Sequence, residues 1–385
     1  MSAGPWLIPN VGGEECSRGQ PPQAAASVAR LWRLLFAGGA RCLGEDAAPD
    51  LAWPVALGAA PEDAAFAWLR GDSEAFAWLN TEAAARAAKA AHVRLAGPPP
   101  AAVREVHDKA FAHGLSQEER LVPASLRGLI AVLDASELEH ADEAVERIQG
   151  HLNAWPSWTR GEFTLKPRLG SSGRGRVAGS GGRADTPELR GALPRLARQG
   201  GALLEPWLRR RRDLSVQLYV APDGALTLLG TLTQELSESG VYRGHRGALD
   251  YKARVVSESE CEDALLEAAL SVARAAHARG FYGPCGVDAF SFEGPDGVEL
   301  RPVLEFNARF TTGTVVVGLL RRARETIAAQ LQLAAGERRA FRFTLDAPSD
   351  ADDDPALLRL PLAAHGEPLQ PALWIAREPG VALDA

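Results

Sequence analysis

The sequence predicts a mixed α/β and α+β fold, and three observations support this prediction. The chain opens with a short apolar strand, a glycine-containing loop and a helix, which together begin an α/β unit. From Glu162 onward the apolar residues come in short runs typical of strands. A long helix then leads into a β-hairpin at Gly286–Arg309. With 385 residues, the chain is long enough for two or three domains.

The N-terminal region, residues 1–97, is expected to form an α/β domain. Trp6–Ile8 is predicted to be its first strand, followed by a loop at Pro9–Glu15 and a helix at Ala24–Phe36. The loop segment Asn10–Glu15 is a candidate to face a ligand from this domain, because loops between regular elements often carry binding residues.

An alanine-rich stretch follows and contains a near repeat, Ala65–Leu69 and Ala75–Leu79. We interpret the repeat as packing between helices, since an aromatic stripe is more often core than part of a site. Gly97–Pro100 is the predicted linker to the next part of the chain, because consecutive prolines cannot continue a helix.

Residues 98–160 are expected to begin a small central subdomain. Helices are predicted at Ala101–His113 and Leu138–Leu152, with a short strand at Leu129–Leu133 between them.

Residues 161–325 are expected to carry most of the strands and a long helix at Glu260–Arg279. The predicted strands before that helix are Glu162–Pro167, Arg174–Val177, Leu203–Leu208, Asp213–Val220, Leu226–Thr233 and Tyr251–Val256. The glycine-rich segment Glu238–Ala248 is predicted to be a mobile loop between strands. In the tail, residues 326–385, we expect a helix and an acidic turn that pack on the core, and we find no chemistry there.

Composition argues against several classes of protein. A formal net charge of −7 and a pI near 5.7 argue against a nucleic-acid binder, whose affinity rests on clustered Lys and Arg. Arg209–Arg212 is the exception, and we interpret it as a solvated turn, with recognition of an anionic ligand as the alternative. Every apolar run is shorter than the roughly 18 residues of a membrane span.

The four cysteines lie far apart and show no metal-ligand spacing, so neither a disulfide framework nor a zinc site is predicted. The N-terminus has no basic region followed by an apolar segment, and therefore does not resemble a secretory signal. We expect a protein of the reducing cytoplasm that does not bind membranes.

The hairpin at Gly286–Arg309 carries the strongest chemical signal. Glu305 and Asn307 stand two residues apart on the second strand and therefore share a face, and the turn near Pro295 brings Asp288 opposite Val303 or Glu305. Three hard oxygen ligands converging from two strands suit Mg²⁺ bound to a nucleotide. The alternative is a set of solvated strand residues.

A second candidate site lies at the end of a predicted strand, where Lys166 precedes a loop of glycines and serines. Glycines let backbone N–H groups turn toward phosphate oxygens, and the lysine adds a positive charge. The loop lacks the Lys-Ser or Lys-Thr of a Walker motif, and an ordinary hairpin turn is the alternative.

Taken in order, these elements resemble the ATP-grasp superfamily over roughly residues 100–320. The resemblance rests on Asp108-Lys109, Lys166 with its glycine loop, the strand around Glu205, and the terminal Asp288 and Glu305-Phe-Asn307-Ala-Arg309 pattern. It implies an ATP-grasp fold preceded by a Rossmann-like domain. Asp288 departs from the glutamate found at that position in many members, which shortens the side chain but keeps the charge.

The resemblance also implies roles for individual residues. Asp288, Glu305 and Asn307 match the metal ligands, Arg309 matches the residue at the reacting phosphate or carboxylate, and Asp213 matches a ribose contact. The matched nucleotide-binding positions are Lys109, Lys166, Gly170, Ser171, Ser172, Gly173, Gly175, Glu205, Pro206 and Leu208. Pro206 and Leu208 are expected to line the adenine through their backbone groups.

Family members often place substrate contacts in the segment that corresponds to Glu238–Ala248 and the residues after it. The candidates there are Arg243, His245, Lys252 and Arg254, and a plain hairpin loop is the alternative for each.

The activity implied by the resemblance is ATP-dependent amide formation between a carboxylate and an amine through an acylphosphate, with ADP and phosphate as products. The cofactors implied are ATP and Mg²⁺, with Mn²⁺ as a substitute. A small-molecule kinase and a catalytically silent nucleotide-binding module are the alternatives. The sequence leaves the two substrates unidentified, with amino acids and peptides as candidates, and it leaves a homodimer open.

Overall fold

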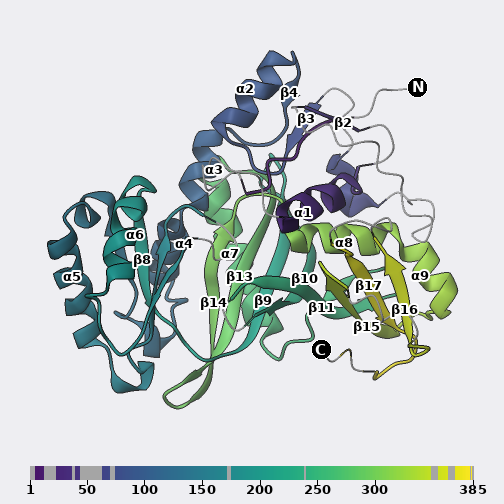
Figure 1. The fold of residues 1–385 in the computed structure, drawn as a ribbon. Coiled ribbons are helices and arrows are strands. Elements are labelled where there is room, and N and C mark those ends of the chain that lie inside the picture. Colours follow the sequence, from purple (N-terminus) through teal and green to yellow (C-terminus); the bar gives the residue numbers. More distant parts are fainter. Residues whose placement is uncertain are drawn as a thin grey trace.

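The computed structural model describes residues 5–12, 23–36, 40–43, 63–69, 74–170, 175–237, 240–347, 354–362, 369–381 and 383. These residues form three sheets (Figure 1). A nine-stranded sheet occupies the centre, a small helix-covered lobe with its own four-stranded sheet lies at one end, and the N-terminal domain packs against the centre. The mixed α/β and α+β prediction is confirmed.

The N-terminal domain is a parallel four-stranded sheet in the order β2-β1-β3-β4. The elements are β1 (Trp6–Ile8), α1 (Gln23–Arg33), β2 (Arg41–Cys42), η3 (Ala64–Leu69), β3 (Glu74–Ala77), α2 (Glu82–Ala90) and β4 (Arg94–Leu95). The predicted first strand is confirmed, and the predicted first helix ends at Arg33 rather than at Phe36.

The interpretation of the near repeat as two packed helices is wrong. Only the first copy is helical, as the short 3₁₀ helix η3, whereas the second copy forms the central strand β3. Because β3 hydrogen-bonds on one side to β1 and on the other to β4, its backbone groups are satisfied in the sheet. Tertiary pairing therefore overrides the helix preference of an alanine-rich sequence.

The small lobe is an antiparallel sheet in the order β5-β8-β6-β7. The elements are β5 (Ala131–Asp134), η5 (Ala135–Leu138), α5 (Ala141–Ala154), β6 (Phe163–Pro167), β7 (Val177–Gly179), α6 (Pro187–Arg198) and β8 (Gly201–Pro206). The lobe has a hydrophobic core of its own, centred on fully buried side chains such as Leu133, Leu165 and Leu193. The strand predicted at Arg174–Val177 is displaced to Val177–Gly179.

The connection from the N-terminal domain to the lobe contains two helices, α3 (Pro100–His107) and α4 (Lys109–Glu118), where one helix was expected. The break lies at Asp108, whose extended backbone stops α3. Its side chain accepts a hydrogen bond from the Ala110 backbone N–H at 2.8 Å and so caps the start of α4.

The central sheet runs in the order β14-β13-β9-β10-β12-β11-β15-β17-β16. Its strands are β9 (Arg210–Val220), β10 (Leu226–Leu236), β11 (Tyr242–Asp250), β12 (Val255–Val256), β13 (Gly283–Gly294), β14 (Gly297–Asn307), β15 (Arg338–Thr344), β16 (Leu357–Pro361) and β17 (Ala372–Ala376). The helices associated with it are α7 (Glu262–His277), α8 (Thr312–Arg322) and α9 (Arg324–Leu331).

Two expectations about this sheet are corrected. Most of the predicted loop Glu238–Ala248 is the strand β11, which pairs with both β10 and β15, and the strand predicted at Tyr251–Val256 is reduced to Val255–Val256. The tail does pack on the core, but it does so by adding β15, β16 and β17 to one edge of the sheet.

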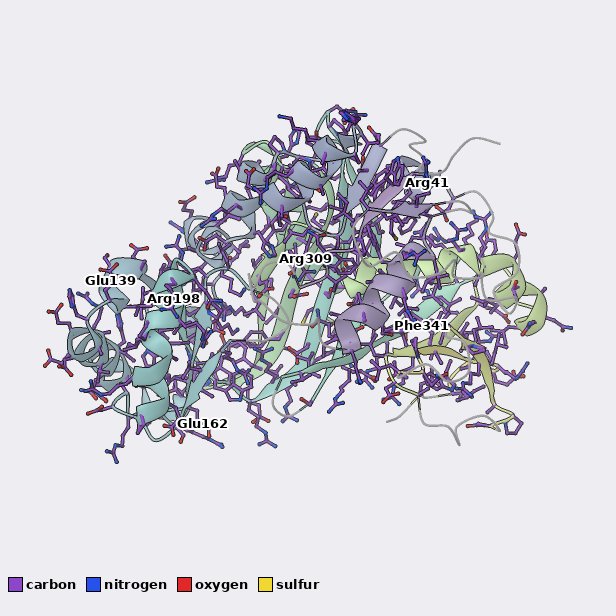
Figure 2. All side chains as sticks on the ribbon, turned by 45° about the horizontal axis from the view of Figure 1, so that its top comes forward. Arg41, Glu139, Glu162, Arg198, Arg309 and Phe341 are labelled. Atoms are coloured by element: carbon purple, nitrogen blue, oxygen red, sulfur yellow. The ribbon has the colours of Figure 1, made fainter. Side chains whose placement is uncertain are left out.

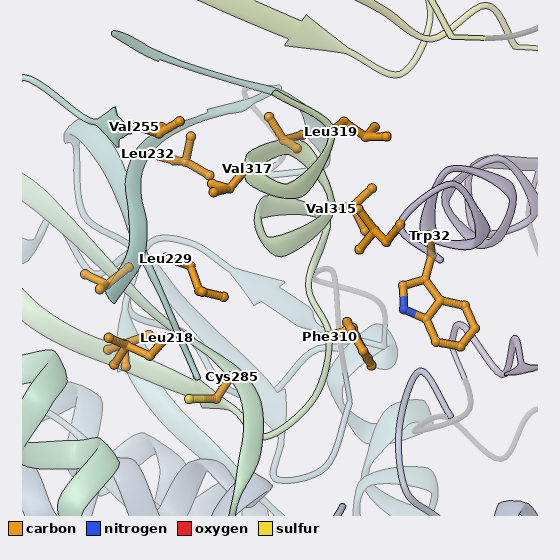
Figure 3. Packing of buried hydrophobic residues seen from close by; sticks show 14 of the residues in the cluster. Trp32, Leu218, Leu229, Leu232, Val255, Cys285, Phe310, Val315, Val317 and Leu319 are labelled. Atoms are coloured by element: carbon orange, nitrogen blue, oxygen red, sulfur yellow. The ribbon is translucent and has the colours of Figure 1, made fainter. Parts of the chain in front are cut away.

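The largest hydrophobic core joins the N-terminal domain to the central sheet. Trp32 of α1 lies against Phe310, with ring centroids 5.2 Å apart, and Figure 3 shows both close to Val315 of α8. This packing fixes α1 and the start of α8 relative to the end of β14. In the part of the chain that the structure describes, no helix is long and apolar enough to cross a membrane.

Candidate functional site

A cavity of about 380 Å³ lies where the N-terminal domain, the small lobe and the central sheet meet. Side chains from α1, α4, β6, β9, β10, β11, β13, β14 and the start of α8 line it. Arg309 is one of the lining residues, and Figure 2 shows it near the middle of the molecule. Its position between separate parts of the chain is typical of ligand sites.

The hairpin β13–β14 supplies the acidic wall of this cavity. Asp288 pairs directly with Glu305 in the sheet register, which is one of the two partners that the predicted hairpin allowed. Asn307 donates from Nδ2 to Asp288 Oδ2 at 2.9 Å. Gln234 of β10 donates from Nε2 to the other oxygen, Asp288 Oδ1, at 2.6 Å. All three predicted ligand residues therefore line one cavity, and the solvated alternative is excluded.

The two carboxylates have different proton affinities. Burial, and then the neighbouring charge of Glu305, raise the pKa of Asp288 to about 7. Burial also works to raise the pKa of Glu305, but attraction to Lys109 and other nearby cations outweighs it and holds that pKa below its ordinary value. A cation between the two oxygen groups would relieve their repulsion.

These residues fit a divalent metal. Asn307 Oδ1 is buried and has no hydrogen-bond partner, which leaves a lone pair for a cation. The donors are hard oxygens, as Mg²⁺ prefers. Among the described residues, no group of three or more His, Cys, Asp or Glu side chains is arranged to hold a metal, so the site proposed here rests on two carboxylates and an amide.

Metal affinity at this site is expected to increase with pH. Below a pH of about 7 Asp288 holds a proton that a metal must displace, so Mn²⁺ should bind roughly tenfold more tightly at about pH 8 than at about pH 6. In the metal-free protein the sign for stability is opposite: the raised pKa stabilises the fold at low pH, and this contribution is lost as the pH rises through about 7.

Mn²⁺ binding followed by water proton relaxation measures this dependence. In Asp288→Asn the dependence should flatten, because the remaining ligand Glu305 keeps a lowered pKa. An unchanged pH dependence in that variant would exclude Asp288 as the titrating group.

Lys109 lies beside the acidic pair and is buried, so it is not an exposed helix lysine. Its Nζ donates to the backbone oxygen of Gly170 at 2.7 Å and lies 3.3 Å from Glu305 Oε2. The same side chain thus links the start of the glycine loop to the acidic wall. Gly170 also lines the cavity and has a positive φ of 155°, while Gly175 has a φ of 72° and contacts Arg195. Ser171, Ser172 and Gly173 lie outside the described residues.

Lys166 enters the cavity from β6, and its ion pair with Glu205 lies in the adjoining protein interior. Glu205 also accepts a hydrogen bond at 2.8 Å from Nη1 of Arg301, which is buried on β14. Burial lowers the pKa of Lys166 to about 8, and the Glu205 charge opposes this shift. Burial also opposes ionisation of Glu205, but its two cationic partners hold its pKa far below the ordinary range.

The segment Glu205–Leu208, at the end of β8, was expected to line an adenine through Pro206 and Leu208. Of residues 205–208, however, only Trp207 is among the described residues that line the cavity. The Cζ atom of Arg176 lies over the Trp207 ring, 4.1 Å from its centroid, and the Cζ atom of Arg210 lies 5.3 Å from the same centroid. Asp213 also lines the cavity and pairs with Arg210 at 2.5 Å.

The interpretation of Arg209–Arg212 as a turn is wrong, because Arg210–Arg212 begin the strand β9, but two of the four side chains are solvated as expected. Arg209 and Arg211 are exposed and pair with Glu293. Arg210 points the other way, into the cavity wall, because side chains alternate along β9.

Arg309 follows Asn307 by two positions in the sequence and lines the cavity beside Trp78. The Cζ atom of Arg309 lies 5.9 Å from the centroid of the Trp78 ring. Its Nη1 donates to the Phe310 backbone oxygen at 2.9 Å. Thr311 then caps α8 by accepting from the Thr314 N–H at 3.0 Å. A guanidinium is therefore held close to the predicted metal ligands.

Of the four predicted substrate residues, only His245 lines the cavity. It is buried on β11, and burial lowers its pKa to about 3, so the imidazole is neutral near pH 7. Arg243, Lys252 and Arg254 are exposed and do not line the cavity; Arg254 pairs with Asp250 at 2.7 Å. From the N-terminal loop, Val11 and Gly12 line the cavity, while Glu14 and Glu15 lie outside the described residues.

Sequence reasoning missed four residues that line the cavity, namely Gln234, Arg176, Trp207 and Tyr242, and it also missed Arg301, which pairs with Glu205 outside the lining. Gln234 could have been found from the alternation along β10, since its register partner on β9 is Asp213. Arg301 gave no comparable signal, because its partner Glu205 is 96 positions away.

No known family model matches the sequence, and no curated protein matches it significantly. Solved structures do match. A carboxyaminoimidazole ribonucleotide synthase from Aspergillus clavatus complexed with ATP has a TM-score of 0.54 at 14% identity, over 97% of this chain and 94% of that one. A biotin carboxylase from Campylobacter jejuni in an ATP-analogue complex has a TM-score of 0.53 at 15% identity, over 96% and 86%.

An N5-carboxyaminoimidazole synthetase from Staphylococcus aureus complexed with ADP has a TM-score of 0.53 at 11% identity, over 98% of this chain and 93% of that one. At such identities the similarity establishes the fold alone. It extends over nearly the whole chain, including the N-terminal domain and the tail.

Proposed function

The chain has the ATP-grasp fold, and we propose that it is an ATP- and Mg²⁺-dependent ligase that joins a carboxylate to an amine. The observation that carries the proposal is the meeting, in one cavity, of the acidic hairpin residues with Lys109, Lys166 and Arg309. Oxygen ligands beside three cations suit a metal-bound polyphosphate better than any other common ligand.

The proposed reaction proceeds in two steps. A carboxylate oxygen attacks the γ-phosphorus of ATP, the bond to ADP breaks, and an acylphosphate forms. The amine nitrogen then attacks the acyl carbon, phosphate leaves, and the amine loses a proton. Bound Mg²⁺ supplies charge neutralisation of the phosphates and alignment of the donor.

The residues of the cavity have distinct roles in this proposal. Asp288, Glu305 and Asn307 hold the metal, and Lys109 and Lys166 bind phosphate oxygens. Trp207 with Arg176 and Arg210 offers a flat surface for the base, while Asp213 remains the proposed ribose contact. Arg309 stabilises the anionic acylphosphate and the developing phosphate charge.

Several solved structures with this fold hold the ligands that the proposal requires. The Aspergillus clavatus structure contains ATP, and a Hydrogenobacter thermophilus biotin carboxylase domain contains MgADP and bicarbonate. A small carboxylate, bicarbonate included, is therefore a reasonable first substrate. The described cysteines are free, which fits the cytoplasm that we propose as its location.

A coupled ADP-release screen tests the function. Carboxylates, bicarbonate, amino acids and short peptides are offered singly and in pairs, and the products are identified by mass spectrometry. Release of ADP and phosphate that requires both a carboxylate and an amine supports the ligase. Release of ADP with a phosphorylated alcohol would instead show a kinase, and release of AMP would contradict both.

A further inference from the structure

A second cavity, of about 210 Å³, adjoins the cavity of the predicted metal ligands, called the metal cavity below, at Trp78 and Arg309. Both residues line the two cavities, so they form part of a shared wall. The second cavity is bounded by β3 and β4 of the N-terminal domain, by the ends of β9 and β13, and by the segment between β14 and α8. The reaction proposed above does not use it.

The second cavity is rich in aromatic side chains, which make up seven of its described lining residues. Its lining aromatic residues are Trp68, Phe76, Trp78, Tyr219, Phe281, Tyr282 and Phe310. Trp68 and Tyr219 stack with centroids 4.5 Å apart and an interplanar angle of 8°, and Tyr282 is fixed by donating its hydroxyl to the Gly97 backbone oxygen at 2.7 Å. These contacts hold the rings in place before any ligand arrives, so little ordering entropy is lost on binding.

The size of this cavity suits one ring system. A cavity of about 150 Å³ is large enough for benzene, and the cavity here is somewhat larger. It is too small for a nucleotide. Flat aromatic walls favour a planar ring over a saturated one, since offset stacked and edge contacts add to simple burial.

The polar groups of the cavity select an anion. Among the described lining residues the charged side chains are Glu74, Arg94 and Arg309, which leaves one net positive charge. Glu74 and Arg94 pair with each other. Arg309 is mostly shielded from solvent at the shared wall, where a charge-assisted hydrogen bond is stronger than at an exposed site.

We propose that the second cavity is a binding site for a small planar aromatic carboxylate, with its ring against Trp68, Trp78 and Tyr219 and its carboxylate on Arg309. The site rests on the geometry of the second cavity and stands whether or not the chain is a ligase. Because Arg309 also faces the metal cavity, a ligand bound here contacts a residue of the proposed reaction centre.

Three probes of similar size test separately whether binding requires the planar ring and whether it requires the negative charge. Benzoate has both the ring and the charge, benzamide lacks the charge, and cyclohexanecarboxylate lacks the planar ring. Binding to the purified full chain without nucleotide is measured by calorimetry and by quenching of tryptophan fluorescence. Benzoate is expected to bind at least about fivefold more tightly than either of the others. Equal affinity for all three, or no saturable binding, would overturn the proposal.

Variants locate the site. Trp68→Leu should weaken benzoate and benzamide alike, whereas Arg309→Gln should weaken benzoate and leave benzamide unchanged. Tyr219→Leu repeats the aromatic test should Trp68→Leu fail to fold. The matched control is Trp158→Leu, because Trp158 stacks on Phe292 in the small lobe, outside both cavities. Loss of benzoate binding in this control, with circular dichroism unchanged, would place the site elsewhere and refute the proposal.

Discussion

Replacing Glu305 with Gln is expected to abolish turnover while the fold stays intact. The substitution keeps the size of the side chain but removes the carboxylate with the lowered pKa, which is the group that stays ionised beside Asp288 at neutral pH. A metal would then bind one carboxylate instead of two. We expect kcat/KM for ADP release to fall roughly 10³-fold or more, because a metal supplies several kcal/mol of charge stabilisation.

The control for this prediction is Glu293→Gln on the same hairpin. Glu293 pairs with Arg209 and Arg211 at the surface and does not line the cavity, so its loss should leave the rate nearly unchanged. Both variants should unfold close to the wild-type temperature. A Glu305→Gln enzyme that retains a near-normal rate would contradict the metal assignment, and an equal loss in both variants would point to damage of the hairpin itself.

The hairpin was predictable from sequence because its information is local. A turn at Pro295 and Asp296 sets the register of the two strands as far as Phe290 and Arg301, and alternation along each strand shows which side chains share a face. The turn alone does not decide the partner of Asp288, because a bulge between Asp288 and Phe290 shifts the register and brings Asp288 opposite Glu305. Glu305 and Asn307 could be assigned to one face in this way. The place of Lys109 in the same cavity followed only from the resemblance to a known superfamily.

The strand β11 could not be predicted because its stability comes from distant partners. Gly244 and Gly247 give the segment the composition of a loop, yet both lie in register with β15, about a hundred residues further along the chain. At each glycine a Cβ atom would lie within 2.5 Å of a backbone oxygen, so these residues permit close approach of neighbouring backbone. Composition alone does not distinguish glycines that allow close packing of strands from glycines that belong to a flexible loop.

The observed role of Glu205 differs from the expected one because its side chain is buried. The resemblance placed Glu205 among the nucleotide-binding positions. In the structure its side chain does not line the cavity and is turned inward between Lys166 and Arg301. The three groups carry one negative and two positive charges. Glu205 therefore compensates two cations, the buried Arg301 and the partly buried Lys166, which faces the cavity.

This arrangement predicts an asymmetry between two substitutions. Glu205→Gln leaves Lys166 and Arg301 without a counter-charge and should lower the free energy of unfolding by about 3–5 kcal/mol. Arg301→Met leaves an ion pair of Lys166 and Glu205 with no net charge, and it keeps an apolar side chain against Phe290. The free energy of unfolding should therefore fall clearly less than in Glu205→Gln. Denaturant unfolding monitored by circular dichroism measures both values.

The same two variants should change, in opposite directions, the pH at which phosphate binding is lost. Glu205 raises the pKa of Lys166 and Arg301 lowers it, so Glu205→Gln should move the pKa below about 8 and Arg301→Met should move it above about 8. Since only the charged lysine attracts phosphate, ADP affinity should decline at a lower pH in the first variant and at a higher pH in the second. If both variants keep the wild-type pH profile while Lys166→Met abolishes it, Lys166 titrates independently of Glu205 and Arg301, which contradicts the prediction.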